Sequence, residues 1–195
     1  MTGLKRSISV WCEAEGIRWR RALNLYAYDP LPSRRLAQHL KIAVISPTQV
    51  PGIDQQTLLC LLKEDAGWSG ITLPIGEGKH LILYNPTHAS TRHESDIMHE
   101  LSHLLFGHQP IRLRQMAGGF TLREYRADDE KEAAYLGGCL QITAKGLDWT
   151  FQHGMTHNEI AEYFGASLQM VRYRCNMTGR KPVPAWNHYR VSQRR

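Results

Sequence analysis

Two histidines four residues apart, with a glutamate directly after the first, constrain this chain more than any other feature. The segment is His99-Glu100-Leu101-Ser102-His103. On a helix, side chains four residues apart lie one turn above each other on the same face, so both imidazoles can reach one tetrahedral metal ion. Glu100 lies beside that face, where it can take a proton from an attacking water. The spacing therefore predicts a helix here and favours a zinc centre.

The residues around this HExxH pattern indicate that its helix is buried. Apolar side chains surround it: Ile97, Met98, Leu101, Leu104 and Leu105. Two histidines and a glutamate buried without a partner would be costly in such surroundings. The bare pattern can arise by chance, but its apolar setting favours metal binding over coincidence.

A third metal ligand must come from elsewhere, because a catalytic zinc site of this type has three protein ligands and one open position. Four acidic residues open a later predicted helix: Asp128, Asp129, Glu130 and Glu132. That helix continues with small and apolar residues, which would let it pack closely on the HExxH helix and bring one carboxylate to the metal. Acidic residues are also favoured at any helix N-terminus by the helix dipole, so some of the four have only that role.

Apolar periodicity, turn residues and capping residues predict the other elements. Helices are expected at about residues 6–25, 34–40, 55–63, 91–106, 127–141, 157–164 and 167–175. Two strands, at about residues 71–73 and 80–84, form a hairpin with a glycine-rich loop. The expected fold class is therefore α+β, mainly helical, with a small β-sheet or hairpin and a C-terminal helix-turn-helix-like segment.

Length and composition indicate one core with a small C-terminal addition. A chain of 195 residues can bury a sizeable core. We expect the core at residues 1–145, a helix-turn-helix-like segment packed on it at 146–180, and a basic tail at 181–195. No apolar stretch approaches the roughly 20 residues that span a bilayer, and the first ten residues lack the apolar part of a secretory signal. A cytoplasmic protein with no membrane partner is therefore expected.

The cysteines give no sign of a second metal site. Cys12, Cys60, Cys139 and Cys175 are far apart in the sequence and form no CxxC pair. Their spacing argues against a structural zinc knuckle and against a thioredoxin-like redox motif. We interpret them as buried free thiols.

The C-terminal segment permits a second class of function. Residues 159–171 have the apolar spacing and the glycine turn of a helix-turn-helix, and four basic residues follow: Arg172, Arg174, Arg180 and Lys181. With a net charge of +6, contact with DNA is physically allowed. We favour the interpretation that the two short helices pack on the core while the arginines are solvated. The alternative to an enzyme is a zinc-stabilised DNA-binding or protein-interaction module, including a toxin-antitoxin component, without protease activity.

Beyond the HExxH pattern, the chain resembles the ImmA/IrrE family of metallopeptidases. That family pairs HExxH with a later helix of the form Glu-x-Glu-Ala-Asn/Asp-x-Phe-Ala-Ala, and residues 130–138, Glu-Lys-Glu-Ala-Ala-Tyr-Leu-Gly-Gly, fall in register with it. The resemblance covers most of residues 5–180. It implies a gluzincin-like zinc metallopeptidase core in which His99, His103 and Glu130 hold Zn²⁺, with Glu132 as the second choice for the third ligand, and Glu100 is catalytic.

The chain departs from the family pattern beside this site. Ala134 stands where members usually have Asn or Asp, which would orient a zinc-bound histidine from behind. Support must then come from elsewhere, and Asp96, one turn before the first histidine, is the candidate. Thr143 replaces a common proline, and Gly137-Gly138 replace Ala-Ala. These changes keep the ligands but bear on catalytic efficiency.

The resemblance also implies a reaction and a partner. The activity would be hydrolysis of a peptide bond in a protein, with a helix-turn-helix transcriptional repressor encoded nearby as the substrate. Such pairs occur in mobile elements, toxin-antitoxin systems and stress responses. The donor that would steady the oxyanion is left open among five residues: Tyr125, Tyr163, Tyr173, His108 and His157. His108 lies off the ligand face of its helix, so a structural role is expected for it.

Overall fold

The computed structural model describes residues 5–63, 66–115 and 121–181. The helices are α1 (Arg6–Ala22), α2 (Ser33–His39), α3 (Gln55–Leu61), α4 (Ser90–Phe106), α5 (Ala127–Gln141), α6 (Ala144–Gln152), α7 (His157–Phe164) and α8 (Leu168–Thr178), with a 3₁₀ turn η1 (Pro47–Gln49). The strands are β1 (Ala43–Ile45), β2 (Gly70–Pro74), β3 (His80–Tyr84), β4 (Arg112–Gln115) and β5 (Thr121–Glu124). The predicted α+β class, dominated by helices, is confirmed.

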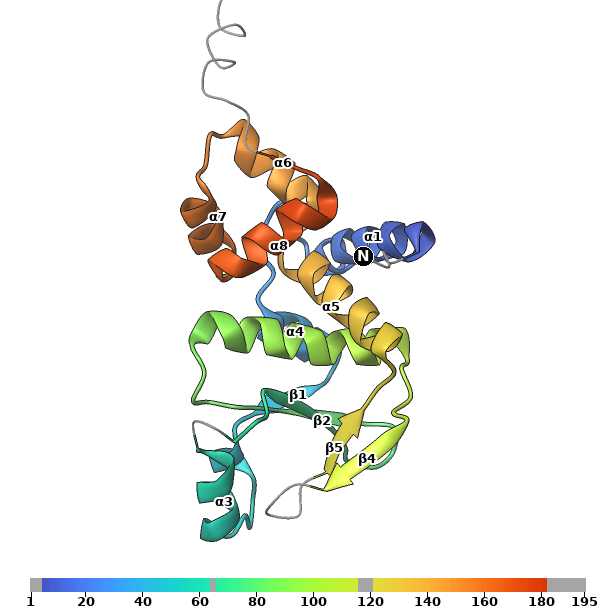
Figure 1. Ribbon diagram of the computed structural model, residues 1–195, viewed down its shortest axis with the longest axis vertical. Coiled ribbons are helices and arrows are strands. Elements are labelled where there is room, and N and C mark those ends of the chain that lie inside the picture. Colours follow the sequence, from blue (N-terminus) through green and yellow to red (C-terminus); the bar gives the residue numbers. More distant parts are fainter. Residues whose placement is uncertain (1–4, 64–65, 116–120, 182–195) are drawn as a thin grey trace, which may run out of the picture.

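The strands lie at one end of the molecule and α6 to α8 at the other, with α4 and α5 between them (Figure 1). Strand β3 pairs in parallel with β1 and antiparallel with β2, so the order is β1-β3-β2 and β2 is an edge strand. Helix α4 packs on β2 and β3. The predicted hairpin is thus β2–β3, and it lies directly beneath the HExxH helix.

Helix α4 forms as its sequence predicts. Ile97, Met98 and Leu101 are fully buried in the main core, and each such side chain contributes roughly 1.5–3 kcal/mol. Gly107 ends the helix in the left-handed conformation, with φ of 70°, which glycine adopts without strain. Because this apolar face is packed into the core, α4 holds the histidines and the glutamate of the motif in fixed positions.

Helix α5 packs closely on both α4 and α1 because small residues lie where the helices meet. A Cβ added at Gly137 would lie 3.4 Å from the backbone nitrogen of His99. A Cβ added at Gly16, in α1, would lie 2.7 Å from the carbonyl oxygen of Cys139. The predicted close packing of the small, apolar helix on the HExxH helix is confirmed.

The last three helices form a second core, which adjoins α5. It consists of the buried residues Ile142, Leu147, Phe151, Ile160, Phe164, Ala166, Val171 and Cys175. Arg174, which the sequence offered as a DNA contact, is fully buried: its Nε donates to the carbonyl oxygen of Ile142 at 2.8 Å, and it pairs with Glu13 of α1. Arg180 binds Asp148 at 2.6 Å. Arg174 therefore links α8 to α1 and to the end of α5, whereas Arg180 forms a partly exposed ion pair.

Some elements differ from the sequence predictions. Helix α6 was not predicted; its start is capped by Thr143, whose hydroxyl accepts from the backbone N–H of Gly146 at 2.8 Å. The hairpin β4–β5 and the short strand β1 were also missed, since their few residues carry no clear alternation. The division of the chain near residue 145 stays a prediction. Of the predicted basic tail, residues 182–195 lie outside the described part.

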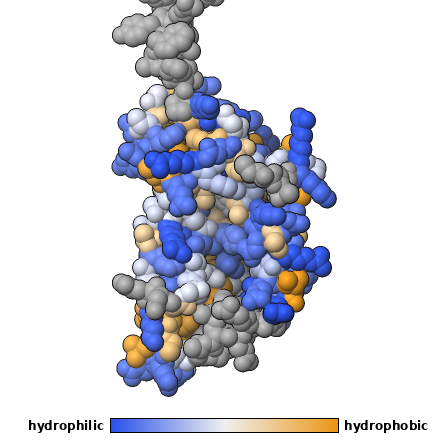
Figure 2. All heavy atoms as spheres, in the orientation of Figure 1, coloured by the Kyte–Doolittle hydropathy of each residue, from blue (hydrophilic) through white to orange (hydrophobic). Residues whose placement is uncertain are grey.

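Polar residues cover much of the surface seen in Figure 2, and most of the cysteines are buried. The face shown in Figure 2 is mainly hydrophilic, with scattered apolar residues. Cys12, Cys139 and Cys175 are buried free thiols, as predicted, whereas Cys60 is half-buried. Burial and the nearby Glu13 raise the pKa of Cys12 to about 12. Among the described residues, no helix has both the length and the apolar character needed to cross a membrane.

We expect Gly16→Ala to lower the free energy of unfolding by about 1–3 kcal/mol, although alanine is the better helix former. The reason is the clash of the new methyl group with the Cys139 carbonyl, which belongs to backbone and cannot swing aside. Urea denaturation measures the effect. Ser7→Ala, at an exposed position of the same helix, should change stability by less than about 0.5 kcal/mol. Equal stability of the two variants would contradict this account of the α1–α5 contact.

Candidate metal centre

Three side chains from two helices converge at the N-terminal end of α5. His99 and His103 lie one turn apart on α4, and their Nε2 atoms are 3.1 Å from each other. Glu130, in the first turn of α5, places Oε2 3.1 Å from Nε2 of His99 and Oε1 3.6 Å from Nε2 of His103. The three donor atoms lie within 4.8 Å of one another. The predicted ligand residues are thus brought together.

The donor set fits a transition-metal ion. Two imidazole nitrogens and one carboxylate form the three-ligand arrangement that leaves a fourth position for water or substrate. Burial is graded across the cluster: the side chain of His103 is 2% exposed, that of His99 30% and that of Glu130 47%. The cluster is therefore anchored in the core on one side and accessible from solvent on the other.

The charges of the cluster keep its carboxylate ionised. Hydrogen bonds from His103 and His99 hold the pKa of Glu130 far below its usual range. Burial opposes a charge on His99, but the hydrogen bond with Glu130 and the charges of Glu100 and Glu130 outweigh it and raise the pKa of His99. A carboxylate that stays ionised near neutral pH is available as a ligand.

Glu100 turns from the helix toward the edge strand β2. The hydroxyl of Thr72 donates to its Oε2 at 2.6 Å. Gly70 leaves room for the same side chain, since a Cβ there would lie 2.9 Å from Cγ of Glu100. Sequence reasoning predicted Glu100 but not Thr72, because nothing local distinguishes a threonine in a strand from its neighbours. The strand thus fixes the direction in which the carboxylate points.

A second histidine and a second glutamate support the cluster from behind. Nδ1 of His108 lies 3.0 Å from Nδ1 of His103, and its Nε2 lies 3.4 Å from Oε2 of Glu132. His108 therefore reaches the ring edge of His103 that faces away from Glu130. Glu132, the second choice for a ligand, lies outside the cluster of three. His108 was expected to lie off the ligand face; it lies outside the cluster of three and contacts it from behind, because the chain turns after Gly107.

Asp96, the candidate for orienting a metal-binding histidine, contacts two other residues of the chain. Its carboxylate contacts Nδ1 of His88 at 3.2 Å and Nε of Arg92 at 3.7 Å. Its charge contributes to the raised pKa of His99. No Asn or Asp is present at position 134 to orient a metal-binding histidine. A hydrogen bond with His108 orients one instead, and the histidine that it orients is His103 rather than His99.

Tyr125, just after β5, lies against the same cluster. Its ring stacks on that of His103, with centroids 3.8 Å apart and planes 16° from parallel. Burial raises the pKa of its hydroxyl, so it stays protonated and can donate near neutral pH. Of the other residues left open as oxyanion donors, Tyr163 stacks on Trp149 and His157 lies near Cys175 in the second core. Tyr173 lines the adjoining hollow.

We expect His108→Ala to weaken metal binding about 10–100-fold, because His103 would lose the partner that orients its ring. A competition titration against a chromophoric chelator measures the dissociation constant. His153→Ala, at an exposed position on the second core, is the control and should bind metal as the unchanged protein does. His108→Gln, which keeps a hydrogen-bonding group, should recover part of the loss. Equal metal affinity in His108→Ala and the control would contradict the role of this contact.

A known protein family matches the part of the chain that contains the cluster. The family model described as the IrrE N-terminal-like domain, a peptidase family, matches residues 61–176. No curated protein matches the chain in a sequence search. The matched span is more than half of the chain and contains α4 and α5, which supply the donor cluster, and the β4–β5 hairpin between them. The chain therefore belongs to the peptidase family of the IrrE N-terminal-like domain and contains a metallopeptidase-like domain.

Proposed function

We propose that the protein is a zinc-dependent endopeptidase that hydrolyses a peptide bond in a protein partner. The observation that carries the proposal is the convergence of His99, His103 and Glu130 within 4.8 Å, next to Glu100. Two imidazoles and a carboxylate with an open fourth position are the ligand set of a catalytic zinc. Family membership supports a hydrolytic role for it.

His99, His103 and Glu130 would hold the ion, which supplies a more acidic water and a polarised peptide carbonyl. Glu100 acts as the general base: it accepts the proton of the attacking water and later passes it to the leaving amine. The hydrogen bond from Thr72 occupies one oxygen of Glu100 and orients the other. A positioned carboxylate loses little freedom when the reaction begins.

Tyr125 is proposed as the donor to the oxyanion. Its ring is held against His103, and burial raises the pKa of its hydroxyl, which therefore keeps its proton near neutral pH. A donor in place before the reaction stabilises the charge that develops on the carbonyl oxygen. Tyr125 directly follows β5, so the hairpin β4–β5 leads into this side of the site.

The edge strand β2 is proposed to bind the substrate backbone. It pairs with β3 on one side, and its residues Gly70 and Thr72 contact the side chain of Glu100. An extended peptide that adds to a sheet edge gains main-chain hydrogen bonds irrespective of its sequence. Such a peptide would pass the general base, as an endopeptidase requires.

The partner is proposed to be a helix-turn-helix repressor encoded near this protein, with a place in transcription regulation, in a toxin-antitoxin pair or in a stress response in the cytoplasm. The support for this is the family resemblance. The rival function is a zinc-stabilised interaction or DNA-binding module. Burial of Arg174 removes one of the four cations that favoured DNA contact.

We expect Glu100→Gln to lower cleavage of the neighbouring repressor-like protein about 10²–10⁴-fold, because the water loses its base. Mass spectrometry of the fragments measures the effect and locates the scissile bond. The variant should bind zinc and keep the thermal stability of the unchanged protein. Glu162→Gln, at an exposed position on α7, should cleave normally. Equal cleavage by Glu100→Gln would reject the mechanism, and binding without cleavage by any form would favour the interaction module.

We expect Tyr125→Phe to lower kcat by roughly 10²–10³ with little change in KM, because the oxyanion forms after binding. Steady-state kinetics with a peptide that spans the scissile bond separate the two constants. The phenyl ring retains the stack on His103, so zinc affinity should stay the same. A change in zinc affinity with unchanged kcat would assign Tyr125 a structural role instead.

A further inference from the structure

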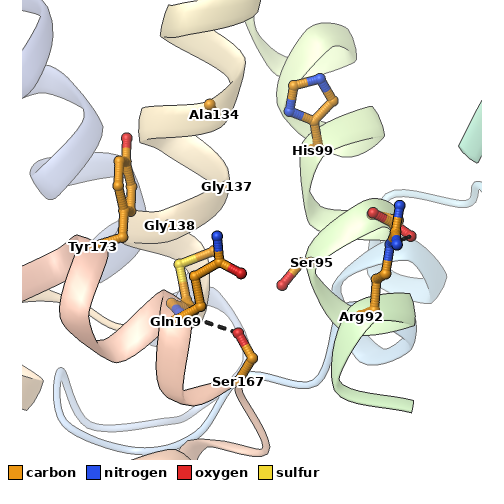
Figure 3. A pocket seen from close by; sticks show the side chains of 11 residues that line it. Arg92, Ser95, His99, Ala134, Gly137, Gly138, Ser167, Gln169 and Tyr173 are labelled. Atoms are coloured by element: carbon orange, nitrogen blue, oxygen red, sulfur yellow. Dashed lines mark hydrogen bonds and ion pairs between the residues drawn. The ribbon is translucent and has the colours of Figure 1, made fainter. Parts of the chain in front are cut away.

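A hollow of about 460 Å³ adjoins His99 between α4, α5 and α8. Figure 3 shows His99 and Ser95 on the α4 side, and Gln169 on α8 pointing toward Ser95 across the space. Its volume lies in the range of pockets that hold small ligands. Because a residue of the metal cluster forms part of its wall, anything bound there lies beside the site of chemistry.

The hollow exists because α5 has almost no side chains on this face. Ala134, Gly137 and Gly138 form its floor. Gly138 also lets α8 approach, since a Cβ there would lie 2.9 Å from Cδ of Arg174 and 3.1 Å from Cε1 of Tyr173. Of the two departures from Ala-Ala, the glycine at position 138 therefore lets α8 lie close to the floor of the hollow.

The wall formed by α8 is held rigidly. The Ser167 hydroxyl accepts from the backbone N–H of Met170 at 3.1 Å and caps the helix. One turn after Met170, buried Arg174 binds the carbonyl oxygen of Ile142 and the carboxylate of Glu13. The hollow is thus preformed, which reduces the entropy lost when a ligand binds.

The lining selects for size and against charge. Met170 and Tyr173 offer a thioether and an aromatic ring, and Ser95 and Gln169 offer neutral hydrogen-bonding groups. The charged residues at the rim, Arg92 and Asp96, lie 3.7 Å apart and offset each other. A charged side chain that entered would lose water without gaining a dedicated partner. A long or aromatic uncharged side chain would bury its apolar surface.

We propose that this hollow receives the side chain of the substrate residue next to the scissile bond and selects large uncharged side chains, aromatic ones or methionine and leucine. The proposal rests on the peptidase function. It makes α8 part of the specificity site, with Gln169 as a specificity-determining residue.

The test uses the full zinc-loaded chain and a mixture of proteome-derived peptides, with cleavage sites read by mass spectrometry. Gln169→Trp fills the hollow, and Arg172→Trp is the matched control, because both positions are exposed on α8 but only Gln169 lines the hollow. In the unchanged protein and the control, large uncharged residues should be enriched at one position beside the cut. In Gln169→Trp, the preference for large over small residues at that position should fall at least about tenfold.

A second measurement does not depend on cleavage. In a titration with N-acetylphenylalanine amide, followed by NMR, the amides of Ala134, Gly137 and Gly138 should shift. N-acetylaspartate amide should shift them less, and Gln169→Trp should abolish the effect while Arg172→Trp preserves it. Thermal melting of both variants is the control that checks whether they are folded.

The outcomes separate the two proposals. Cleavage that depends on Glu100 but shows the same preference in Gln169→Trp and Arg172→Trp would overturn the specificity pocket and leave the peptidase intact. If no form cleaves, the peptidase proposal fails and with it the substrate role of the hollow. The titration then decides whether the hollow selects uncharged side chains at all, and unchanged amide signals would reject that selectivity too.

Discussion

The close contact between α4 and α5 is the constraint on which the metal cluster depends. Two ligands come from α4 and one from α5, so the distance between the helix axes sets whether three donor atoms can meet. Gly137 lies against the backbone of His99, where an added Cβ would be in ordinary contact at 3.4 Å. A side chain longer than alanine would press on this backbone and tend to separate the helices. The same absence of side chains opens the hollow beside His99.

Two buried arginines hold the other end of α5. Nη2 of Arg20 donates to the carbonyl oxygen of Gln141 at 2.9 Å, and Nε of Arg174 donates to that of Ile142 at 2.8 Å. These carbonyls end a helix and have no partner within it. Burial lowers the pKa of Arg20 to about 10, so it stays charged near neutral pH. Buried charges are costly, but Arg20 meets three carbonyl acceptors and Arg174 meets one carbonyl and the carboxylate of Glu13, so removing either arginine would leave buried carbonyls unpaired.

Local sequence was enough to predict the two helices that carry the cluster, and it failed where distant segments meet. Helix α5 was predicted with its observed bounds, and the predicted helix at about residues 91–106 ends where α4 ends, because apolar periodicity and capping residues act within one helix. Thr72, Tyr125 and His108 contribute through contacts with residues 5 to 28 positions away in the sequence. No pattern within a single helix or strand encodes these contacts. Arg174 was interpreted as a surface cation because its buried partner, Glu13, is so distant in the chain.

The pairing of Glu13 with Arg174 links residues 161 positions apart. During synthesis, α1, α4 and α5 leave the ribosome well before the arginine that completes the end of α5. The helix bearing Glu130 thus acquires this anchor only after residues 142–174 have also been made. A chain cut before Arg174 would keep all three donor residues, but the carbonyl oxygen of Ile142 and the carboxylate of Glu13 would lack their common partner.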